Sequence, residues 1–379
     1  MMNTPTIWIN AGETSGDLHG QLLVQALREQ CPDARFLGMA GPAMRAEGVE
    51  AKLETEHLSV MGITEVLVQL PKILRLLHTL KINLMETRPD VVVVIDAPDF
   101  HFRVARTARN LGIPVIYYIS PKLWAWRAGR TRFISRHVDR LISILPFEVD
   151  FYARHGMHVD YVGHPLLDSV RRPEILAVAD QPRRVGILPG SREREIAALL
   201  PVFSRAADLL ATSCPDLEFV LPVAPGMDPQ LIARFWTARQ PIALTDSDTR
   251  YATMRSCRAI MAASGTATLE TALLGVPTVV AYKFSRLTYA LGRALVRVPF
   301  ISLPNLILGT EVFPEFLQQE ATPWAIAARL AQWIPDSRSR TDVLTRLASL
   351  PGLLGGGHAA RRAARIILST LGEAKCPVI

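Results

Sequence analysis

Two stretches, VGILPGSRERE (Val185–Glu195) and AIMAASGTATLE (Ala259–Glu270), share one organisation, and together they decide the fold class. Each begins with an apolar run typical of a buried parallel strand, passes through a glycine-containing turn and continues into a helical pattern. The N–H groups at the start of a helix have no intrahelical partner and lie at the positive end of the helix dipole, so they bind an anion without a dedicated side chain. The two turns therefore predict a phosphate site.

The side chains of these turns refine the prediction to a nucleoside diphosphate. Gly190 and Ser191 lie in the first turn, and Arg192 adds a planar set of donors that suits phosphate oxygens. Glu270 follows Gly265 by about one and a half helical turns. From that place a carboxylate can accept hydrogen bonds from both hydroxyls of a ribose. Neither turn is a Walker loop, which requires Gly-Lys-Ser/Thr, and neither is a GxGxxG fingerprint.

Apolar runs alternate with helical patterns along the whole chain. This rhythm predicts an α/β protein of the doubly wound kind, with two Rossmann-like domains whose parallel sheets face one another across a ligand cleft. The predicted strands are Ile7–Ala11, Val91–Asp96, Pro114–Ser120, Leu141–Leu145, His158–Val162, Val185–Leu188, Leu217–Val223, Ala259–Ala262 and Thr278–Tyr282.

The domain boundaries follow changes in composition. Residues 1–175 are predicted to form an N-terminal domain and residues 176–350 a C-terminal domain, because Arg171–Arg184 is rich in Arg, Pro and Asp and resembles a linker. Residues 351–379 contain a basic helical pattern, Ala359–Leu371, which we expect to pack back on the N-terminal domain.

The composition is that of a basic globular protein. The net charge of +7 over 379 residues favours anionic partners. The sequence contains no aromatic RNA-binding motif, zinc finger or long basic run, so nucleic acid is not a predicted partner. The mean hydropathy of +0.20 is high and favours a lipid-facing protein.

Cysteine spacing and the first residues predict a cytoplasmic location. The four cysteines are scattered without metal-type spacing, which favours a reducing compartment and argues against a zinc site or a disulfide scaffold. The start of the sequence has neither a basic region nor a long apolar core, so we expect no signal peptide, and no other segment is predicted to span a bilayer.

Asp96 is the candidate general base. It follows the apolar run VVVVI (Val91–Ile95), so we expect it at the carboxyl edge of the sheet, where such sheets bind ligands. The alternative is a turn or N-cap aspartate, but Pro98 and Asp99 already suit that turn, and Asp99 is the better N-cap candidate.

The loop AGETSGDLHG (Ala11–Gly20) follows the first predicted strand in the same way. Gly16 permits the close approach of a ligand, and Glu13, Ser15 and Asp17 offer oxygens that suit sugar hydroxyls. The alternative is a capping box at the following helix, which accounts for Ser15 or Asp17 but not for Glu13.

Two further motifs are more ambiguous. The segment YISPKLWAWRAGR (Tyr118–Arg130) places Trp124 beside Arg127; aromatic rings line sugar and acyl pockets, but such tryptophans are equally often core residues. Asp246 and Asp248 resemble a metal-binding DxD motif. Because they directly precede a helical pattern, we interpret them as an N-cap and predict no metal site.

The stretch Val66–Met85 has apolar residues at helical spacing, with basic residues mostly off that stripe. Such a stripe is ordinarily a core face, and Lys81 interrupts it. Leu74 and Leu76 nevertheless widen the apolar arc beyond one packing surface, so we predict contact with a membrane or an acyl chain.

Ten motifs, in this order and over nearly the whole chain, resemble those of the lipid-A-disaccharide synthases, and PEFLQ (Pro314–Gln318) also matches. The ten are AGETSGDLHG (Ala11–Gly20), MAGPAMRAEG (Met39–Gly48), VMGITEVL (Val60–Leu67), IDAPDF (Ile95–Phe100), SPKLWAWR (Ser120–Arg127), LPFE (Leu145–Glu148), VGHPL (Val162–Leu166), PGSRERE (Pro189–Glu195), SGTATLE (Ser264–Glu270) and SLPN (Ser302–Asn305).

The resemblance implies a GT-B glycosyltransferase at the cytoplasmic side of the inner membrane, with no cofactor and no metal. Its substrates are implied to be UDP-2,3-diacylglucosamine and 2,3-diacylglucosamine 1-phosphate, and its products UDP and a β-1,6 disaccharide on the route to lipid A. The phospholipid surface is implied as a further partner. Members of the family are described as dimers that swap C-terminal domains, which implies a homodimer.

The resemblance also implies roles for single residues. Asp96 becomes the base for the 6-hydroxyl of the acceptor. The acceptor side further includes Glu13, Ser15, Gly16, Asp17, Asp99, His101, Trp124 and Arg127, while the donor side includes Gly190, Ser191, Arg192, Ser264, Gly265, Thr266 and Thr268 for the diphosphate, Glu270 for the ribose, and Asn305 and Gln318. His101 departs from the asparagine common in the family; simple tolerance and a part in proton handling are both open.

Three other functions compete with this interpretation. A UDP-N-acetylglucosamine epimerase or another GT-B transferase would share fold and nucleotide site, but the motifs AGETSGD and SPKLWAWR argue against it. A two-domain ligand-binding protein would normally be exported. A peripheral membrane scaffold would leave the two glycine turns unexplained.

Overall fold

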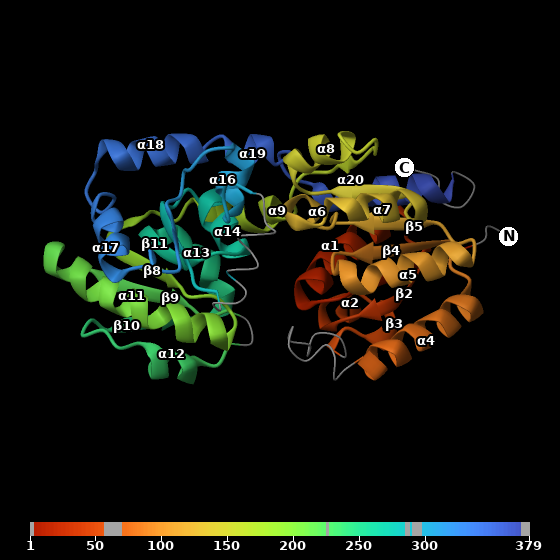
Figure 1. The fold of residues 1–379 in the computed structure, drawn as a ribbon, viewed down its shortest axis with the longest axis horizontal. Coiled ribbons are helices and arrows are strands. Elements are labelled where there is room, and N and C mark those ends of the chain that lie inside the picture. Colours follow the sequence, from red (N-terminus) through yellow and green to blue (C-terminus); the bar gives the residue numbers. More distant parts are fainter. Residues whose placement is uncertain (1–3, 57–69, 225–226, 285–288, 290–297, 373–379) are drawn as a thin grey trace. The chain divides into compact units, whose positions relative to one another are not determined.

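The computed structural model describes residues 4–56, 70–224, 227–284, 289 and 298–372. The chain divides into two compact units, Met1–Pro165 together with Gly357–Ile379, and Leu166–Gly356 (Figure 1). The predicted α/β fold with two parallel sheets is confirmed, because each unit contains one parallel sheet covered by helices.

The first unit contains a seven-stranded parallel sheet in the order β3-β2-β1-β4-β5-β6-β7. Its strands are β1 (Thr6–Ala11), β2 (Arg35–Ala40), β3 (Glu50–Glu54), β4 (Val91–Ile95), β5 (Val115–Tyr118), β6 (Arg140–Ser143) and β7 (Asp160–Tyr161). Its helices are α1 (Thr14–Gln30), α2 (Pro42–Ala46), α4 (Leu70–Thr87), α5 (Pro98–Asn110), α6 (Leu123–Trp126), η1 (Ala128–Arg130), α7 (Thr131–His137), α8 (Pro146–Ala153) and α20 (Ala359–Leu371).

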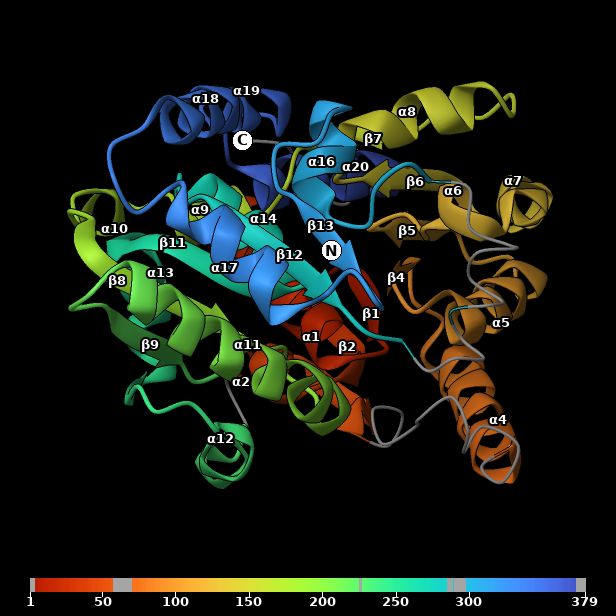
Figure 2. The same cartoon turned by 60° about the vertical axis from the view of Figure 1, so that its left-hand side comes forward.

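The second unit contains a six-stranded parallel sheet in the order β10-β9-β8-β11-β12-β13. Its strands are β8 (Gln181–Leu188), β9 (Glu218–Pro222), β10 (Ile242–Thr245), β11 (Cys257–Ala263), β12 (Thr278–Tyr282) and β13 (Glu315–Leu317). Its helices are α9 (Leu166–Val170), α10 (Pro173–Leu176), α11 (Glu193–Ser213), α12 (Pro229–Phe235), η2 (Ser247–Thr249), α13 (Arg250–Ser256), α14 (Thr266–Leu273), α16 (Leu303–Leu308), α17 (Pro323–Ala331), α18 (Arg338–Leu347) and α19 (Leu350–Leu353). Helices α11 and α17 lie side by side (Figure 2).

In both sheets the direction in which successive strands are added reverses at one point. The loops that carry the candidate sites lie at this point. The chain builds β1, β2 and β3 outward in one direction and then returns to add β4 beside β1; in the second unit it returns to add β11 beside β8. In open α/β sheets, ligands bind beyond the carboxyl ends of the strands at such a switch point. The loops after β1 and β4, and those after β8 and β11, are therefore the places to examine.

Some elements differ from the predictions. Strands β3, β10 and β13 had not been predicted, because short or partly exposed strands give a weak pattern. Strand β2 was also missed, although it is buried after Arg35, because Gly38 interrupts its apolar run. The predicted linker at Arg171–Arg184 contains α10 and the start of β8, and the two units divide at Pro165. Helix α20 belongs to the first unit, where Arg362 donates to the carbonyl of Val162 and Arg361 pairs with Glu29.

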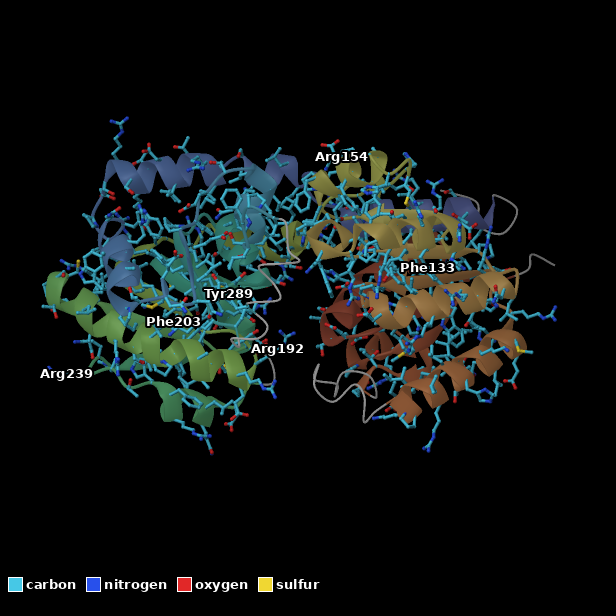
Figure 3. The ribbon with its side chains drawn as sticks, in the orientation of Figure 1. Phe133, Arg154, Arg192, Phe203, Arg239 and Tyr289 are labelled. Carbon is cyan, nitrogen blue, oxygen red and sulfur yellow. The ribbon has the colours of Figure 1, made fainter. Side chains whose placement is uncertain are left out.

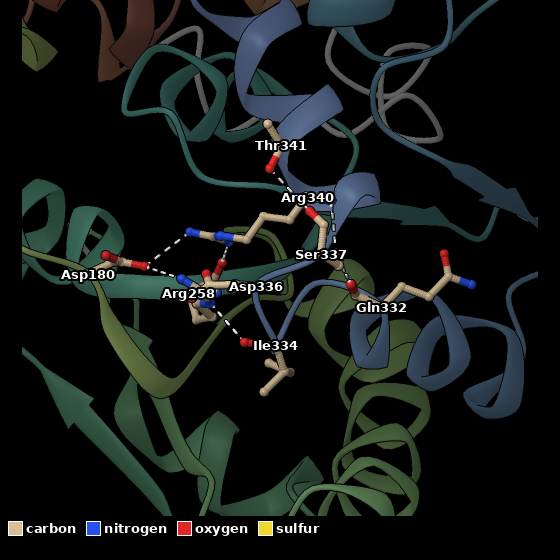
Figure 4. Close-up of polar contacts among 8 residues, drawn as sticks. All are labelled: Asp180, Arg258, Gln332, Ile334, Asp336, Ser337, Arg340 and Thr341. Atoms are coloured by element: carbon tan, nitrogen blue, oxygen red, sulfur yellow. Dashed lines mark hydrogen bonds and ion pairs between the residues drawn. The ribbon is translucent and has the colours of Figure 1, made fainter.

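An ion-pair cluster in the second unit links helix α18 to strand β11 (Figure 4). Arg258 on β11 donates to Asp180 over 2.9 Å, to the carbonyl of Ile334 over 2.9 Å, and to Asp336. Arg340 on α18 donates to the same Asp180 over 3.0 Å. Both guanidinium groups are buried, so the two carboxylates are required to offset the desolvation of two charges.

Within the described residues, α11 is the one helix long and apolar enough to cross a membrane, judged by length and composition alone. Its side chains Ile196, Leu199 and Phe203 are buried in the core of the second unit, which makes α11 a core helix. The cysteines fit the predicted reducing compartment only in part: Cys214 and Cys257 are free thiols, whereas Cys31 is disulfide-bonded.

Candidate functional site

The two glycine turns of the second unit lie at one edge of its sheet. Strand β8 pairs with β11, and Leu188 is in register with Ala262, so both strands end at the same level. Helices α11 and α14 begin directly after these turns, at Glu193 and Thr266. Two helix starts therefore lie at the switch point of this sheet, the arrangement from which the sequence predicted a phosphate site.

The two turn glycines have different reasons to be glycine. Gly190 has a φ of +104°, and a Cβ there would lie 2.4 Å from Oε2 of Glu195, so the fold itself requires glycine. Gly265 has an extended backbone, with a φ of 165°, and a Cβ there would meet no atom of the described residues within 4 Å. The fold therefore does not require glycine at position 265. The lack of a side chain there leaves open space next to the start of α14.

Arg192 precedes the first residue of α11 and extends into solvent (Figure 3). Its side chain is 76% exposed and pairs with Glu195 over 3.2 Å. Glu195 also accepts a hydrogen bond from Tyr282 over 3.1 Å. The position of Arg192 keeps most of its donors available to an anion bound at the helix start.

Three of the predicted donor residues are held by the protein itself. Asn305 is fully buried; it donates to the carbonyl of Phe313 over 2.7 Å and accepts from the amide of Val312 over 2.8 Å. Thr268 is buried and donates to the carbonyl of Gly265 over 2.8 Å. These contacts use the polar atoms that the prediction assigned to the ligand, so Asn305 and Thr268 act as supports of the loop and of the helix start.

Glu270 is the third of these residues, and it retains one oxygen. It is buried, and its Oε1 accepts from Arg250 over 2.8 Å and from Tyr251 over 3.2 Å. Burial raises its pKa, and Arg250 acts in the opposite direction. Both contacts are made to Oε1. Arg250 and Tyr251 were missed because only the tertiary structure brings α13 next to α14.

The other donor-side residues lie nearer the surface. Gly265, Thr266 and Ser191 are exposed, in contrast to the buried Thr268, two residues after Thr266 in α14. Ser264 donates to the carbonyl of Ile301 over 3.1 Å, and Gln318 to the carbonyl of Phe284 over 3.1 Å.

In the first unit, the loops after β1 and β4 also meet at one sheet edge. Ala11 is in register with Ile95, so Glu13, at the N-cap position of α1, and Ser15, in the first turn of α1, follow β1 at the edge where Asp96 follows β4. Glu13 and Ser15 are exposed, and Gly16 is buried. The start of α1 is therefore accessible at Glu13 and Ser15, as the prediction of sugar contacts requires.

Asp17 has a different role from the predicted sugar contact. It is buried, and its two carboxylate oxygens accept hydrogen bonds from the amides of Gly41, Ala43 and Met44 over 2.8, 2.8 and 3.2 Å. Asp17 thus caps the start of α2 from the neighbouring α1. The cap lies more than twenty residues away in sequence, which is why local patterns did not identify it.

Asp96 lies at the end of β4 with a φ of +52°. Burial raises its pKa above the ordinary aspartate value, while Lys122 and the amide of Ala97 act in the opposite direction. A carboxylate with a raised pKa at the carboxyl edge of a parallel sheet has the properties of a general base. Lys122 was not among the predicted site residues, although it lies within the SPKLWAWR motif.

Asp99 is exposed and is not the N-cap of α5, a position taken by Ala97. Its Oδ1 pairs with Arg127 over 2.9 Å and with Arg130 over 2.7 Å. The three groups form a charged surface cluster in which the guanidinium of Arg127 also stacks 3.6 Å from the ring centroid of Trp126. This cluster joins the SPKLWAWR segment to the start of α5.

The environment of His101 disfavours the transfer of protons. Its ring is fully buried, which lowers its pKa to about 4, so it is neutral near pH 7. Nδ1 lies 2.7 Å from the carbonyl oxygen of Asp96, and Nε2 has no hydrogen-bond partner among the described residues. The contact with Asp96 suggests a structural connection to the candidate base instead.

Glu148 is a buried carboxyl that the sequence predictions did not single out. Its oxygens accept hydrogen bonds from Ser120 and Ser143, and from Nε1 of Trp124 over 2.9 Å. Glu148 therefore ties the segments after β5 and β6 together and holds Trp124 by its indole N–H. The only signal in the sequence was the LPFE motif, which placed Glu148 in the resemblance without a role.

We expect the substitution Glu148→Gln to flatten the dependence of stability on pH. Burial raises the pKa of Glu148 from 4.5 to about 7, so the folded state holds a proton that the unfolded state has lost. The contribution of Glu148 to the free energy of unfolding is then fully present below pH 4.5 and is lost as the pH rises to about 7. The loss amounts to at most about 3 kcal/mol. Urea unfolding at pH 5 and pH 8 measures this difference; the exposed Glu86→Gln should leave it unchanged. An equal loss in all three proteins would contradict the expectation.

Metal ligands were not predicted, and within the described ranges no group of three or more His, Cys, Asp or Glu side chains is arranged to hold a metal ion. Asp246 lies at the N-cap position of η2, as expected from its place before a helical pattern, but its side chain makes no capping hydrogen bond.

The structure resembles solved glycosyltransferases and epimerases of the GT-B type. A putative UDP-N-acetylglucosamine 2-epimerase from Listeria monocytogenes superposes with a TM-score of 0.65 at 13% identity, over 98% of both chains. The glycotransferase of kitacinnamycin superposes with a TM-score of 0.64 at 17% identity, over 97% of this chain and 99% of that chain. At such identities the likeness shows a shared fold and does not separate the two activities.

The comparisons of the sequence distinguish the glycosyltransferase from the epimerase. The family model described as lipid-A-disaccharide synthetase matches residues 7–349. The lipid-A-disaccharide synthase of Geobacter sulfurreducens is 43% identical over 374 residues, which is 97% of each chain. On this match, which spans both units, the chain belongs to the lipid-A-disaccharide synthase family.

Proposed function

We propose that the chain condenses UDP-2,3-diacylglucosamine with 2,3-diacylglucosamine 1-phosphate, with inversion at the anomeric carbon. Family membership makes the chain a glycosyltransferase that forms the lipid A disaccharide, and the proposal concerns the two substrates and the residues that act on them. The observation that carries it is the pair of switch points, one with two helix starts and Arg192, the other with Asp96.

On the donor side, the second unit binds UDP through its two glycine turns. The amides at the starts of α11 and α14 receive the diphosphate, and Arg192 supplies a further cation. Oε2 of Glu270 accepts the ribose hydroxyls, since Oε1 is occupied by Arg250 and Tyr251. Asn305 and Thr268 hold this surface in place.

On the acceptor side, Asp96 takes the proton of the 6-hydroxyl as that oxygen forms its bond to the anomeric carbon. The bond from this carbon to the diphosphate breaks, its electron pair leaves with UDP, and the negative charge develops where the helix starts and Arg192 stabilise it. Glu13 and Ser15, which are exposed beside Asp96, bind acceptor hydroxyls.

The acyl chains and the membrane contact α4 in this proposal. The predicted apolar stripe divides in the structure: Ile73, Leu80 and Leu84 are buried in the core, whereas Leu74 and Met85 are exposed. Lys81 is also exposed, and it lies between Leu74 and Met85 on the same face of the helix. An exposed face that mixes apolar and basic residues suits the phospholipid surface at the cytoplasmic side of the inner membrane. Residues 66–69 of the predicted stripe lie outside the described residues.

Gly265→Ala tests the donor site without disturbing the fold. Because a Cβ at this position meets no atom within 4 Å in the described ranges, we expect little change in Tm. The Cβ would occupy the space of the diphosphate, so the KM for the donor should rise at least about tenfold, which corresponds to 1.4 kcal/mol. Gly190→Ala is the contrasting variant, because its φ of +104° and the contact with Glu195 should lower Tm. An unchanged donor KM in Gly265→Ala would place the diphosphate elsewhere.

The proposed reaction is tested by UDP release from UDP-2,3-diacylglucosamine in detergent, with and without the 1-phosphate acceptor. We expect release to require the acceptor and to survive EDTA, because the cationic groups in the proposal belong to the protein. Consumption of UDP-N-acetylglucosamine without any acceptor would instead support an epimerase, the activity after which the structural neighbour from Listeria is named.

A further inference from the structure

Two consecutive residues after β4 have an unusual backbone. Asp96 has a φ of +52° and Ala97 a φ of +44°, and neither is glycine. The left-handed region is unfavourable for residues with a Cβ, so such a pair persists only where the surroundings hold it. The carboxylate of Asp96 is attached to this strained turn, and its direction depends on the turn.

The carbonyl of Asp96 is held by two buried side chains. The hydroxyl of Tyr117 donates to this oxygen over 2.7 Å, and Nδ1 of His101 lies 2.7 Å from the same oxygen. Tyr117 comes from β5, the neighbour of β4, and His101 from the first turns of α5. The two rings meet edge to face with centroids 6.4 Å apart. One oxygen is therefore fixed from two separate elements.

The hydrogen bonds to this carbonyl define the protonation state of His101 and of Tyr117. A carbonyl oxygen accepts and cannot donate, so Nδ1 of His101 carries the proton, and Nε2 is the unprotonated nitrogen. Nε2 is buried and has no hydrogen-bond partner in the part of the chain that the structure describes, and burial lowers the pKa of the ring, which keeps it neutral. Burial also raises the pKa of Tyr117, so its hydroxyl remains a donor.

We propose that Tyr117 and His101 are positioning residues of the glycosyl transfer: by locking the carbonyl of Asp96 they keep the turn left-handed and fix the direction of its carboxylate. This inference rests on the proposed role of Asp96 as the base. It assigns His101 a function through Nδ1–H alone, which the side-chain N–H of asparagine can replace, because the two nitrogens are equally distant from the backbone.

The test compares Tyr117→Phe, His101→Leu and His101→Asn in the full-length protein, with kcat, the KM of each substrate and Tm as readouts. We expect kcat to fall about 10- to 100-fold in Tyr117→Phe and His101→Leu, with each KM within about twofold, because a misdirected base slows the chemical step and leaves binding intact. His101→Asn should restore most of kcat. Ser204→Ala, which removes a buried hydroxyl in the other unit, is the control that changes Tm without changing kcat.

Asp96→Asn is measured in parallel to separate two kinds of failure. If Asp96→Asn is inactive while Tyr117→Phe and His101→Leu keep the wild-type kcat, the positioning role is wrong and the proposed base stands. Wild-type turnover in Asp96→Asn would overturn the base itself. If His101→Leu does not fold, Tyr117→Phe decides the question, and a loss in His101→Asn as large as that in Tyr117→Phe would refute the role of Nδ1–H.

Discussion

Replacement of Asp96 by asparagine is expected to lower kcat by about 10²–10⁴, the usual contribution of a positioned base. Asparagine keeps the size of the side chain and cannot take the proton of the acceptor hydroxyl. The donor is bound by the other unit in our proposal, so its KM should stay nearly constant. Acceptor-dependent release of UDP under single-turnover conditions measures the chemical step directly.

The pH profile gives an independent measure of the same residue. Burial raises the pKa of Asp96, so the group is protonated, and unable to act as a base, up to a higher pH than an ordinary aspartate. The acidic limb of kcat/KM should therefore lie above the usual aspartate range. Asp33→Asn removes the same charge from an exposed turn just before β2, at the opposite edge of the sheet, and should leave both kcat and the profile unchanged. A profile without an acidic limb would argue against Asp96.

Arg192→Ala is expected to lower kcat/KM by about 10²–10³, comparable to the removal of one donor from an oxyanion hole. The diphosphate gains negative charge as the glycosyl bond breaks, and Arg192 is an exposed cation at the N-cap position of α11. Because the Arg192 side chain is 76% exposed, solvent screens its ion pair with Glu195, and Tm should change little.

Two variants sharpen this expectation. Arg194→Ala removes the same charge from an exposed position on the same helical turn, so a comparable loss there would mean that general positive charge, and not Arg192, is responsible. Arg192→Lys keeps the charge but loses the planar fork, and we expect it to recover only part of the activity. Steady-state kinetics with varied donor concentration distinguishes the three proteins.

Much of the fold was predictable from local patterns. Strand β12 was predicted with its observed bounds, as was helix α20, because each has a strong period and clear punctuation. Strand β3 was missed, since its half-exposed sequence EAKLE carries no such period. Helix α1 begins at Thr14 and so includes Gly16 and Gly20, although the glycine-rich segment Ala11–Gly20 was predicted to be a loop.

For the candidate sites too, local patterns predicted some residues and missed the contacts of others. The turn at Gly190–Arg192 and the exposed Glu13 lie where the strand–turn–helix pattern predicted. Asp17 and Asn305 were predicted as ligand contacts on the strength of their chemistry, but the structure shows their polar atoms bonded to backbone groups. Glu148 escaped notice because nothing near it in sequence reveals its partner Ser120.

The sequence by itself determined the fold class, the two glycine turns and the position of Asp96 after a buried strand, because these depend on periodicity and on residues next to one another. Only the tertiary structure decided which strands are neighbours, and hence that the loop after β1 meets the one after β4. It also decided that His101 and Tyr117 both reach the carbonyl of Asp96. The physical reason is that a buried polar group must find a hydrogen-bond partner, and the chain can bring that partner from any distance in sequence.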